Sequence, residues 1–209
     1  MGDPGHGAEG RGASKALHRP KGAGTTASAG SGLRFHETTL QGAWLTEPMP
    51  VHDERGYFAR TFCAREYADR DLVTHFVQHS TSYSKARGTV RGMHFQRAPH
   101  GEVKVVTCLK GAIWDVIIDL RRGSPSFMHW EGFRLSEDNR HRLYIPEGYA
   151  HGFQTLEPDT EVGYLISAFH VPEAAAGLRY DDPTFGIPWP LPPTAISARD
   201  LGWPDFQAS

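Results

Sequence analysis

The sequence predicts an all-β fold, a sandwich or a barrel, that follows a segment without regular structure. Three observations support this prediction. Beyond residue 32, short apolar or alternating runs rich in Val, Ile, Phe, Tyr, Trp and Thr recur at close spacing. Turn-forming residues separate these runs. Only residues 64–71 favour a helix in the first half of the chain. Many short strands with few helices argue against a parallel α/β sheet.

The first 32 residues differ in composition from the rest of the chain. They are rich in Gly, Ala and Ser and have no apolar periodicity. Such a segment buries too little apolar surface to offset the entropy that is lost on ordering. We therefore expect residues 1–32 to be a disordered extension and residues 33–209 to form one domain.

The expected strands follow one another through the middle of the chain. Turns are expected at 110–111, 122–125 and 137–139, where Gly, Pro, Asp and Asn cluster. A further strand is expected to end near Gln96. The other strands are expected at 43–45, 56–62, 76–84, 103–109, 112–120, 128–135, 142–145, 152–156 and 161–169.

The C-terminal stretch, residues 183–206, has a different character. Six prolines exclude it from the centre of a sheet. Its aromatic residues include Trp189, Trp203 and Phe206. We expect this stretch to wrap around the body of the domain, with these side chains holding it in place.

Composition and charge limit the classes of function. The chain has 209 residues, 39% of them hydrophobic, which is enough for one substantial core. A net charge of -2 gives no electrostatic reason to expect nucleic acid or an acidic membrane as a partner. No run is long and apolar enough to span a bilayer, and the N-terminus lacks the apolar part of a secretory signal. Two cysteines, Cys63 and Cys108, leave a single disulfide open but exclude a disulfide scaffold. These features predict a cytoplasmic location.

The strongest chemical pattern begins at Arg91. His94 follows three residues later, and Lys104 follows ten residues after His94. A strand ending near Gln96 and a return strand starting near Glu102 would place His94 and Lys104 side by side. A base, an ammonium group and an anion-binding arginine on one wall suit proton abstraction beside a carbonyl. A surface hairpin with scattered charges is the alternative, and these residues alone do not decide between the two.

Other chemically capable residues are less distinctive by themselves. His151 lies where a Pro-Glu-Gly turn leads into a strand. Tyr164 lies within an expected strand, where a half-buried core tyrosine is the better interpretation from the residues alone. Asp200 follows the proline-rich stretch and has the pattern of a turn or helix-start aspartate.

A metal site is not expected around His94. Metal-binding barrels commonly offer a second histidine two residues later, where this chain has Gln96. Arg91 and Lys104 close to His94 would repel a divalent cation. The residues therefore favour a site without a metal ion.

Seven ordered motifs make the chain resemble the nucleotide-sugar epimerases of the dTDP-4-dehydrorhamnose 3,5-epimerase type. The motifs are DERGYF (53–58), GTVRGMHFQ (88–96), GAIWDVIIDLR (111–121), SPSF (124–127), YIPEGYAHGF (144–153), DDPTFGIPWP (181–190) and ISARD (196–200). The resemblance covers residues 35–206. It implies a cupin-like double-stranded jelly roll with few short helices. It also implies an isomerase of deoxysugar biosynthesis, such as dTDP-rhamnose biosynthesis, that needs no cofactor.

The implied reaction inverts C3, C5 or both in a nucleoside-diphosphate 4-keto-6-deoxyhexose, by proton abstraction next to the C4 ketone. By resemblance, His94 is the base and Asp200 orients it. Tyr164 is the acid on the opposite face of the sugar, and Lys104 lies beside the C4 oxygen. The implied substrate-binding residues are Arg55, Gln78, Arg91, His151 and Arg199. The resemblance further implies a homodimer with exchanged N-terminal strands, in which Arg55 reaches the partner subunit.

Several alternatives stay open at this point. The chain has Ala175 where many family members have a glutamate, and Phe169-His170 in place of an aromatic pair. An epimerase that acts only at C3, an enzyme for a CDP-linked sugar and a nucleotide-sugar ketoisomerase would fit as well. A metal-dependent cupin enzyme and a non-catalytic sugar-binding barrel are more remote.

Overall fold

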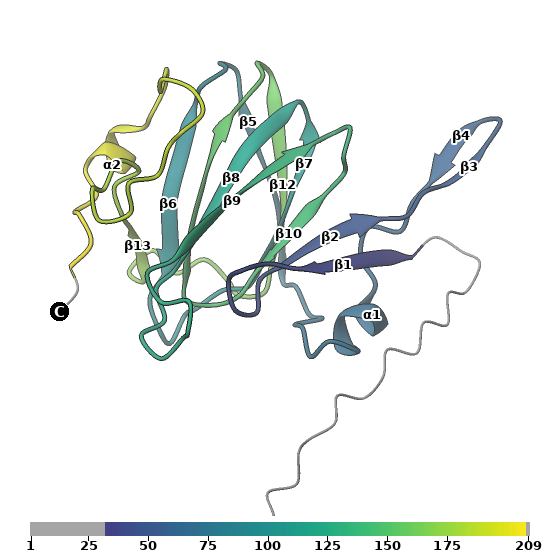
Figure 1. The fold of residues 1–209 in the computed structure, drawn as a ribbon, viewed down its shortest axis with the longest axis horizontal. Helices are drawn as coiled ribbons and strands as arrows, with labels where there is room; N and C mark the ends of the chain where they lie inside the picture. Colours follow the sequence, from purple (N-terminus) through teal and green to yellow (C-terminus); the bar gives the residue numbers. More distant parts are fainter. Residues whose placement is uncertain (1–31, 208–209) are drawn as a thin grey trace, which may run out of the picture. The chain divides into compact units, whose positions relative to one another are not determined.

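The all-β prediction is confirmed. A computed structural model of the protein describes residues 32–207, which belong to one compact unit. The expected extension lies outside the described residues, apart from its last residue. Strands dominate the described part, and two of its sheets face each other as the halves of a cupin-like jelly roll (Figure 1).

Within residues 32–207, all strand pairings in these two sheets are antiparallel. The first sheet has the order β1 (Leu33–Glu37), β2 (Trp44–Pro48), β10 (Arg142–Ile145), β7 (Lys104–Lys110), β12 (Thr160–Ile166) and β5 (Gln78–Ser84). The second has the order β13 (Ala175–Gly177), β6 (Val90–Gln96), β11 (Tyr149–Thr155), β8 (Ala112–Asp119) and β9 (Trp130–Ser136). Both sheets interleave strands that are distant in sequence.

The core fills one end of the space between the sheets. Val106 and Val162 of the first sheet pack with Ile113, Ile117 and other apolar residues of the second. These residues alternate along their strands, since every second side chain points to the same face. Burial of these side chains stabilises the sandwich by about 1.5–3 kcal/mol for each fully buried large residue.

The C-terminal stretch covers the outer face of the second sheet. Met93, Val116 and Ile118 point outward from this sheet and form a second apolar cluster. Trp189 and Phe206 pack against that cluster, so the expected wrapping by aromatic side chains is confirmed for these two residues. β8 is therefore buried on both faces, which explains its almost continuous apolar sequence.

The expected hairpin between Gln96 and Glu102 is wrong. β6 does end at Gln96, but β7 starts at Lys104 in the opposite sheet. Both edges of β6 are already paired, one with β11 and the other with β13, so β7 cannot join it. The intervening residues cross from one sheet to the other. His94 and Lys104 consequently lie on facing walls and not side by side on one strand pair.

Other element boundaries differ locally from the expectations. The expected helix exists as the shorter α1 (Ala64–Ala68), and the expected strand at 56–62 shrinks to β4 (Gly56–Phe58). β4 pairs with β3 (Val51–Asp53) in a separate hairpin that projects from the sheets (Figure 1). The short strands β1, β3 and β13 were not among the expected strands, whereas α2 (Ala198–Leu201) forms where the sequence allowed a turn or a helix start at Asp200. Both cysteines are free thiols, so the disulfide that the sequence left open is not formed.

In the described part of the chain, no helix is long and apolar enough to cross a bilayer.

A buried carboxylate anchors the loop that follows β8. The Asp119 carboxylate accepts hydrogen bonds from Arg121 Nε at 2.8 Å and from Ser126 Oγ at 2.6 Å, and it also contacts Ser124. Burial by itself would raise the pKa of Asp119, but the hydrogen bonds from Arg121, Ser124 and Ser126 hold this pKa below its usual range. The ionised carboxylate is thus part of the folded structure.

Asp119→Asn is expected to lower the free energy of unfolding by about 2–3 kcal/mol at pH 7, because it removes the charge that pairs with Arg121. A lowered folded-state pKa stabilises the fold above the usual carboxyl pKa of about 4, and this stabilisation is lost as the pH falls below that value. Denaturant unfolding at pH 7 and at pH 3 checks this. A difference in unfolding free energy between variant and wild type that does not shrink at pH 3 would contradict the assignment of an ionised Asp119 in the fold.

Candidate active site

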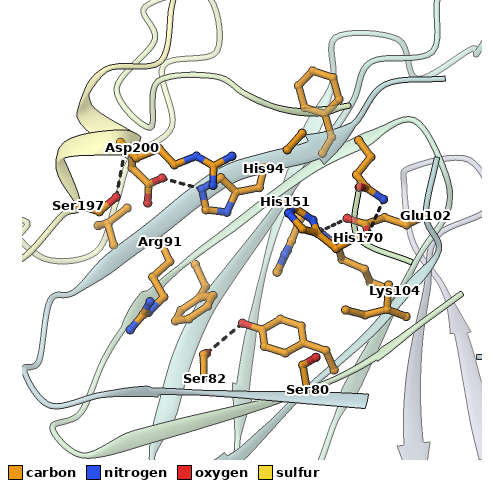
Figure 2. Close-up of a pocket in the computed structure, with 18 of the residues that line it drawn as sticks. Ser80, Ser82, Arg91, His94, Glu102, Lys104, His151, His170, Ser197 and Asp200 are labelled. Atoms are coloured by element: carbon orange, nitrogen blue, oxygen red, sulfur yellow. Dashed lines mark hydrogen bonds and ion pairs between the residues drawn. The ribbon is translucent and has the colours of Figure 1, made fainter. Parts of the chain in front are cut away.

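A cavity of about 810 Å³ lies between the two sheets. Strands β5, β7 and β12 line it from the first sheet, and β6 and β11 line it from the second. Residues of the C-terminal stretch, including α2, complete the wall next to β6. Figure 2 shows His94 with Asp200 on one side of this space and Ser82 on the opposite side.

His94 is held by a carboxylate from the C-terminal stretch. Its Nε2 lies 2.6 Å from Asp200 Oδ1, and the Asp200 side chain is buried while 42% of the His94 side chain is exposed. Ser197 caps α2 by accepting a hydrogen bond from the Asp200 backbone N–H at 3.0 Å. Burial would raise the pKa of Asp200, but its hydrogen bond and ion pair with His94 lower this pKa, so the carboxylate is ionised. The imidazole is therefore fixed at one end and open to the cavity at the other.

A close approach of two strands sets the position of His94. Gly92 has a φ of +135°, and a Cβ on it would lie 2.4 Å from the Cα of Gly152 on β11. Only glycine fits such a conformation and such a contact. This packing brings His94 directly opposite His151 in the β6–β11 register.

His151 is the second histidine of the cavity and also pairs with a carboxylate. Its Nε2 lies 2.7 Å from Asp115 Oδ1, and both side chains are buried. Asp115 projects from the middle of β8 between apolar neighbours. A buried carboxylate of this kind holds an imidazole in one orientation.

Tyr164 faces the two histidines from the first sheet. It belongs to β12, and its hydroxyl lies 3.1 Å from Ser82 Oγ on the neighbouring strand β5. Its ring is in edge-to-face contact with His151 at a centroid distance of 6.4 Å. Burial raises the pKa of Tyr164 well above its usual range, so the phenol keeps its proton at neutral pH.

Lys104 supplies a positive charge to the same cavity. Its Nζ lies 2.9 Å from Glu102 Oε1, and the two side chains are only 13% and 12% exposed. Glu102 also accepts a hydrogen bond from Gln96 Nε2 at 3.2 Å. A largely buried ammonium group acts on nearby charges more strongly than an exposed one, because water screens it less.

Three more of the residues expected at the site line the cavity. Arg91 donates from Nε to Ser84 Oγ at 3.0 Å, which orients its guanidinium. Arg199 stacks on Trp203, with 5.2 Å from its Cζ to the ring centroid. Gln78 also lines the cavity. His170 and Ala175, where the chain differs from the pattern of the family that it resembles, also line the cavity.

Arg55 is the exception among the expected site residues. It lies at the turn of the β3–β4 hairpin, pairs with Asp53 and has an 86% exposed side chain. The structure does not bring it to the cavity of its own chain.

Sequence reasoning gave no role to Ser82 or Asp115, and it named Glu102 only as the start of an expected return strand. Asp115 could have been noticed as a lone charge within an apolar strand. Ser82 alternates with Ser80 and Ser84, a pattern that any half-exposed strand can have. Within residues 32–207, no three His, Cys, Asp or Glu side chains are grouped so that they could hold a metal ion.

The cavity thus combines an imidazole and a phenol on facing walls with an ammonium group between the same sheets. Such an arrangement can remove a proton from one face of a bound molecule and supply a proton to the other face. The charge that develops between these two steps would be stabilised by the ammonium group.

Comparison with known proteins agrees with this chemistry. The family model described as dTDP-4-dehydrorhamnose 3,5-epimerase matches residues 37–208. The enzyme of that name from Methanothermobacter thermautotrophicus is 43% identical over 175 residues, which cover 82% of this chain and 93% of that protein. The crystal structure of the Bacillus anthracis enzyme, with TDP and PPi bound, has a TM-score of 0.81 and 39% identity, and the match covers 84% of this chain and 100% of that one.

A related enzyme with a narrower name is also similar. A dTDP-4-dehydrorhamnose 3-epimerase from Streptomyces niveus is 36% identical over 169 residues, which cover 80% of this chain and 81% of that protein. The family match spans most of the chain, and the relatives are matched over most of their length. The chain belongs to the dTDP-4-dehydrorhamnose 3,5-epimerase family.

Proposed function

We propose that this protein inverts C3, C5 or both in a nucleoside-diphosphate 4-keto-6-deoxyhexose, with His94 as the base and Tyr164 as the acid. One observation carries the proposal. The two side chains extend from opposite sheets into one cavity that also contains the Lys104 ammonium group. The names of the relatives and the TDP bound to one of them support a dTDP-linked sugar as the substrate.

The first step removes a proton from a carbon next to the C4 ketone. His94 takes this proton, and the ionised Asp200 stabilises the imidazolium that forms. The electron pair of the broken C–H bond moves into an enolate, whose negative charge develops on the C4 oxygen. Lys104 stabilises that oxygen in a poorly solvated site.

The second step returns a proton to the other face of the same carbon. Tyr164 donates this proton, and the enolate electrons form the new C–H bond with inverted configuration. The raised pKa of Tyr164 ensures that the phenol is protonated when the enolate forms. The negative charge then lies on the tyrosine oxygen.

The remaining cavity residues hold the nucleotide sugar. We assign Arg91 and Arg199 to the diphosphate, because guanidinium groups bind phosphate oxygens in a bidentate manner. His151 and Gln78 are assigned to polar groups of the substrate. Remote binding of the nucleotide would position the sugar for the proton transfers.

Product analysis tests the proposed reaction. The protein is incubated with dTDP- and CDP-linked 4-keto-6-deoxyglucose, and the sugars are identified by nuclear magnetic resonance. We expect inversion at C3 and C5 of the dTDP-linked sugar. Inversion at C3 alone would identify the narrower activity, and a 3-keto product would identify a ketoisomerase. An unchanged substrate would contradict the proposal.

Lys104→Met is expected to lower kcat by about 10²–10³-fold, because it removes the charge that stabilises the enolate. The dissociation constant for the nucleoside diphosphate is expected to change little, since the lysine acts at the sugar. Steady-state kinetics and calorimetric titration with dTDP check the two quantities. An equal loss of dTDP affinity would instead place Lys104 at the diphosphate.

We further propose a homodimer in which the N-terminal strands are exchanged between subunits. The β3–β4 hairpin leaves three large residues, Val51, Tyr57 and Phe58, at least half exposed in the described part of the chain. A partner subunit would cover them and would receive Arg55 beside its bound nucleotide. The disordered extension expected at residues 1–32 and the domain boundary near residue 33 stay predictions.

Arg55→Ala is therefore expected to raise KM for the nucleotide sugar about tenfold with little change in kcat, as for the loss of one charge-assisted hydrogen bond. Light scattering after size-exclusion chromatography is expected to give the mass of a dimer. The exposed pair Arg34 and Glu47 offers a control, because Arg34→Ala removes an exposed charge outside the hairpin. A monomeric protein, together with an unchanged KM in Arg55→Ala, would overturn the proposed exchange of N-terminal strands.

A further inference from the structure

A proton imbalance remains after each inversion by the proposed reaction, on which this inference rests. His94 has gained a proton and Tyr164 has lost one. His94 can exchange its proton readily, since 42% of its side chain is exposed. Tyr164 is half-buried on the cavity wall, and a sugar bound for proton transfer would cover its hydroxyl, so its phenolate needs a route to the solvent before the next inversion of that sugar.

Ser82 is placed to provide that route. Its Oγ lies 3.1 Å from the Tyr164 hydroxyl, within hydrogen-bond distance, and the dashed line at Ser82 in Figure 2 marks this contact. Ser82 is itself partly exposed and lines the cavity. It belongs to β5, the outermost strand of its sheet in the described part of the chain, which pairs with β12 on one side. Its neighbours Ser80 and Thr81 are exposed.

Two other polar groups near Tyr164, on Arg91 and His151, are already engaged. Arg91 donates to Ser84 Oγ and to the backbone carbonyl of Tyr83. His151 is bound to Asp115 through Nε2. The pKa of Tyr164 is raised by burial and lowered by the hydrogen bond with Ser82, so the serine hydroxyl favours the phenolate that the reaction leaves behind.

We propose that Ser82 is the proton relay that recharges Tyr164 between inversions. The Ser82 hydroxyl gives its hydrogen to the phenolate oxygen while its own oxygen takes a hydrogen from a water molecule. That water recovers a proton from the solvent, to which His94 releases the proton that it abstracted. One proton enters and one leaves, so each inversion is balanced.

The relay gives Ser82 a specific influence on the products. If the same base and acid serve C3 and C5, Tyr164 must be recharged before the second carbon of a bound sugar can be inverted. A protein without the serine hydroxyl would complete the first inversion and then pause. Ser82 thereby sets the ratio of doubly to singly inverted sugar.

Ser82→Ala separates a relay from a merely structural role. With enzyme in excess over substrate, the first inversion is expected to stay within about twofold of wild type, because Tyr164 starts with its proton. Steady-state turnover is expected to fall by about tenfold or more, and singly inverted sugar is expected to accumulate. Quenched-flow sampling with nuclear magnetic resonance of the products measures both. Equal losses of rate under enzyme excess and in the steady state, or no loss of rate in either, would overturn the relay.

Three further variants sharpen this test. Ser82→Thr keeps a hydroxyl and is expected to restore steady-state turnover; failure to do so in a folded protein would count against the relay. Ser82→Ala is expected to have no further effect in a Tyr164→Phe background, and an additive loss would show that the serine acts elsewhere. His79→Ala, at an exposed position of the same strand that does not line the cavity, is expected to behave as wild type. A wild-type protein that inverts nothing would refute the proposed function itself, which is a distinct result.

Discussion

Replacing His94 with alanine is expected to abolish both inversion and the exchange of substrate hydrogens with deuterated water. The imidazole is the base that the geometry provides on its side of the sugar, and Asp200 holds it in place at 2.6 Å. Loss of a general base costs about 10²–10⁴-fold in rate. Because enolate formation precedes every later step, exchange should fall by the same factor as inversion.

A matched histidine control is available on β5. His79 is exposed and lies outside the cavity lining, so His79→Ala should exchange and invert at the wild-type rate. Proton nuclear magnetic resonance of the sugar follows the loss of the C3 and C5 signals over time. Exchange at the wild-type rate in His94→Ala would remove His94 from the role of base.

Replacing Tyr164 with phenylalanine should separate exchange from inversion. His94 can still form the enolate and return a solvent deuteron to the original face, so deuterium should enter the substrate without a change of configuration. Inversion should fall by about 10²-fold or more, because the proton donor on the other face is missing. The phenyl ring keeps the packing against His151, so the fold and dTDP binding should be retained.

The same sample gives both readouts for Tyr164→Phe. Mass spectrometry reports deuterium content, and the coupling constants of the ring hydrogens report configuration. Unchanged inversion would mean that another group serves as the acid. Loss of exchange together with inversion, in a protein that still binds dTDP, would mean that Tyr164 takes part in enolate formation.

The fold class was predictable because it depends on local patterns. Alternating apolar runs and turn residues located most strands, and the strand at Arg142–Ile145 was expected at its observed bounds. The pairing of those strands is not local. The spacing of Gln96 and Glu102 fits a hairpin as well as it fits a crossing between sheets. The hairpin is excluded because both edges of β6 are already paired, with β11 and with β13.

The site shows the same division between local and long-range information. Arg91 and His94 form a recognisable local pattern, whereas the partner of His94 is 106 residues away and was expected only through family resemblance. The contact between Ser82 and Tyr164 also joins residues far apart in sequence, 82 positions, and no motif announces it. Short polar residues on strands are too common to be assigned a role without the fold.

The most direct test of the account is a single-turnover incubation of the wild-type protein with dTDP-4-keto-6-deoxyglucose in deuterated water. If protons are removed and returned across the cavity, each inverted carbon receives its hydrogen from an acid in exchange with the solvent. We predict deuterium at every carbon whose configuration has changed. Inverted sugar that keeps its original hydrogen at C3 or C5 would contradict proton abstraction and return across the cavity.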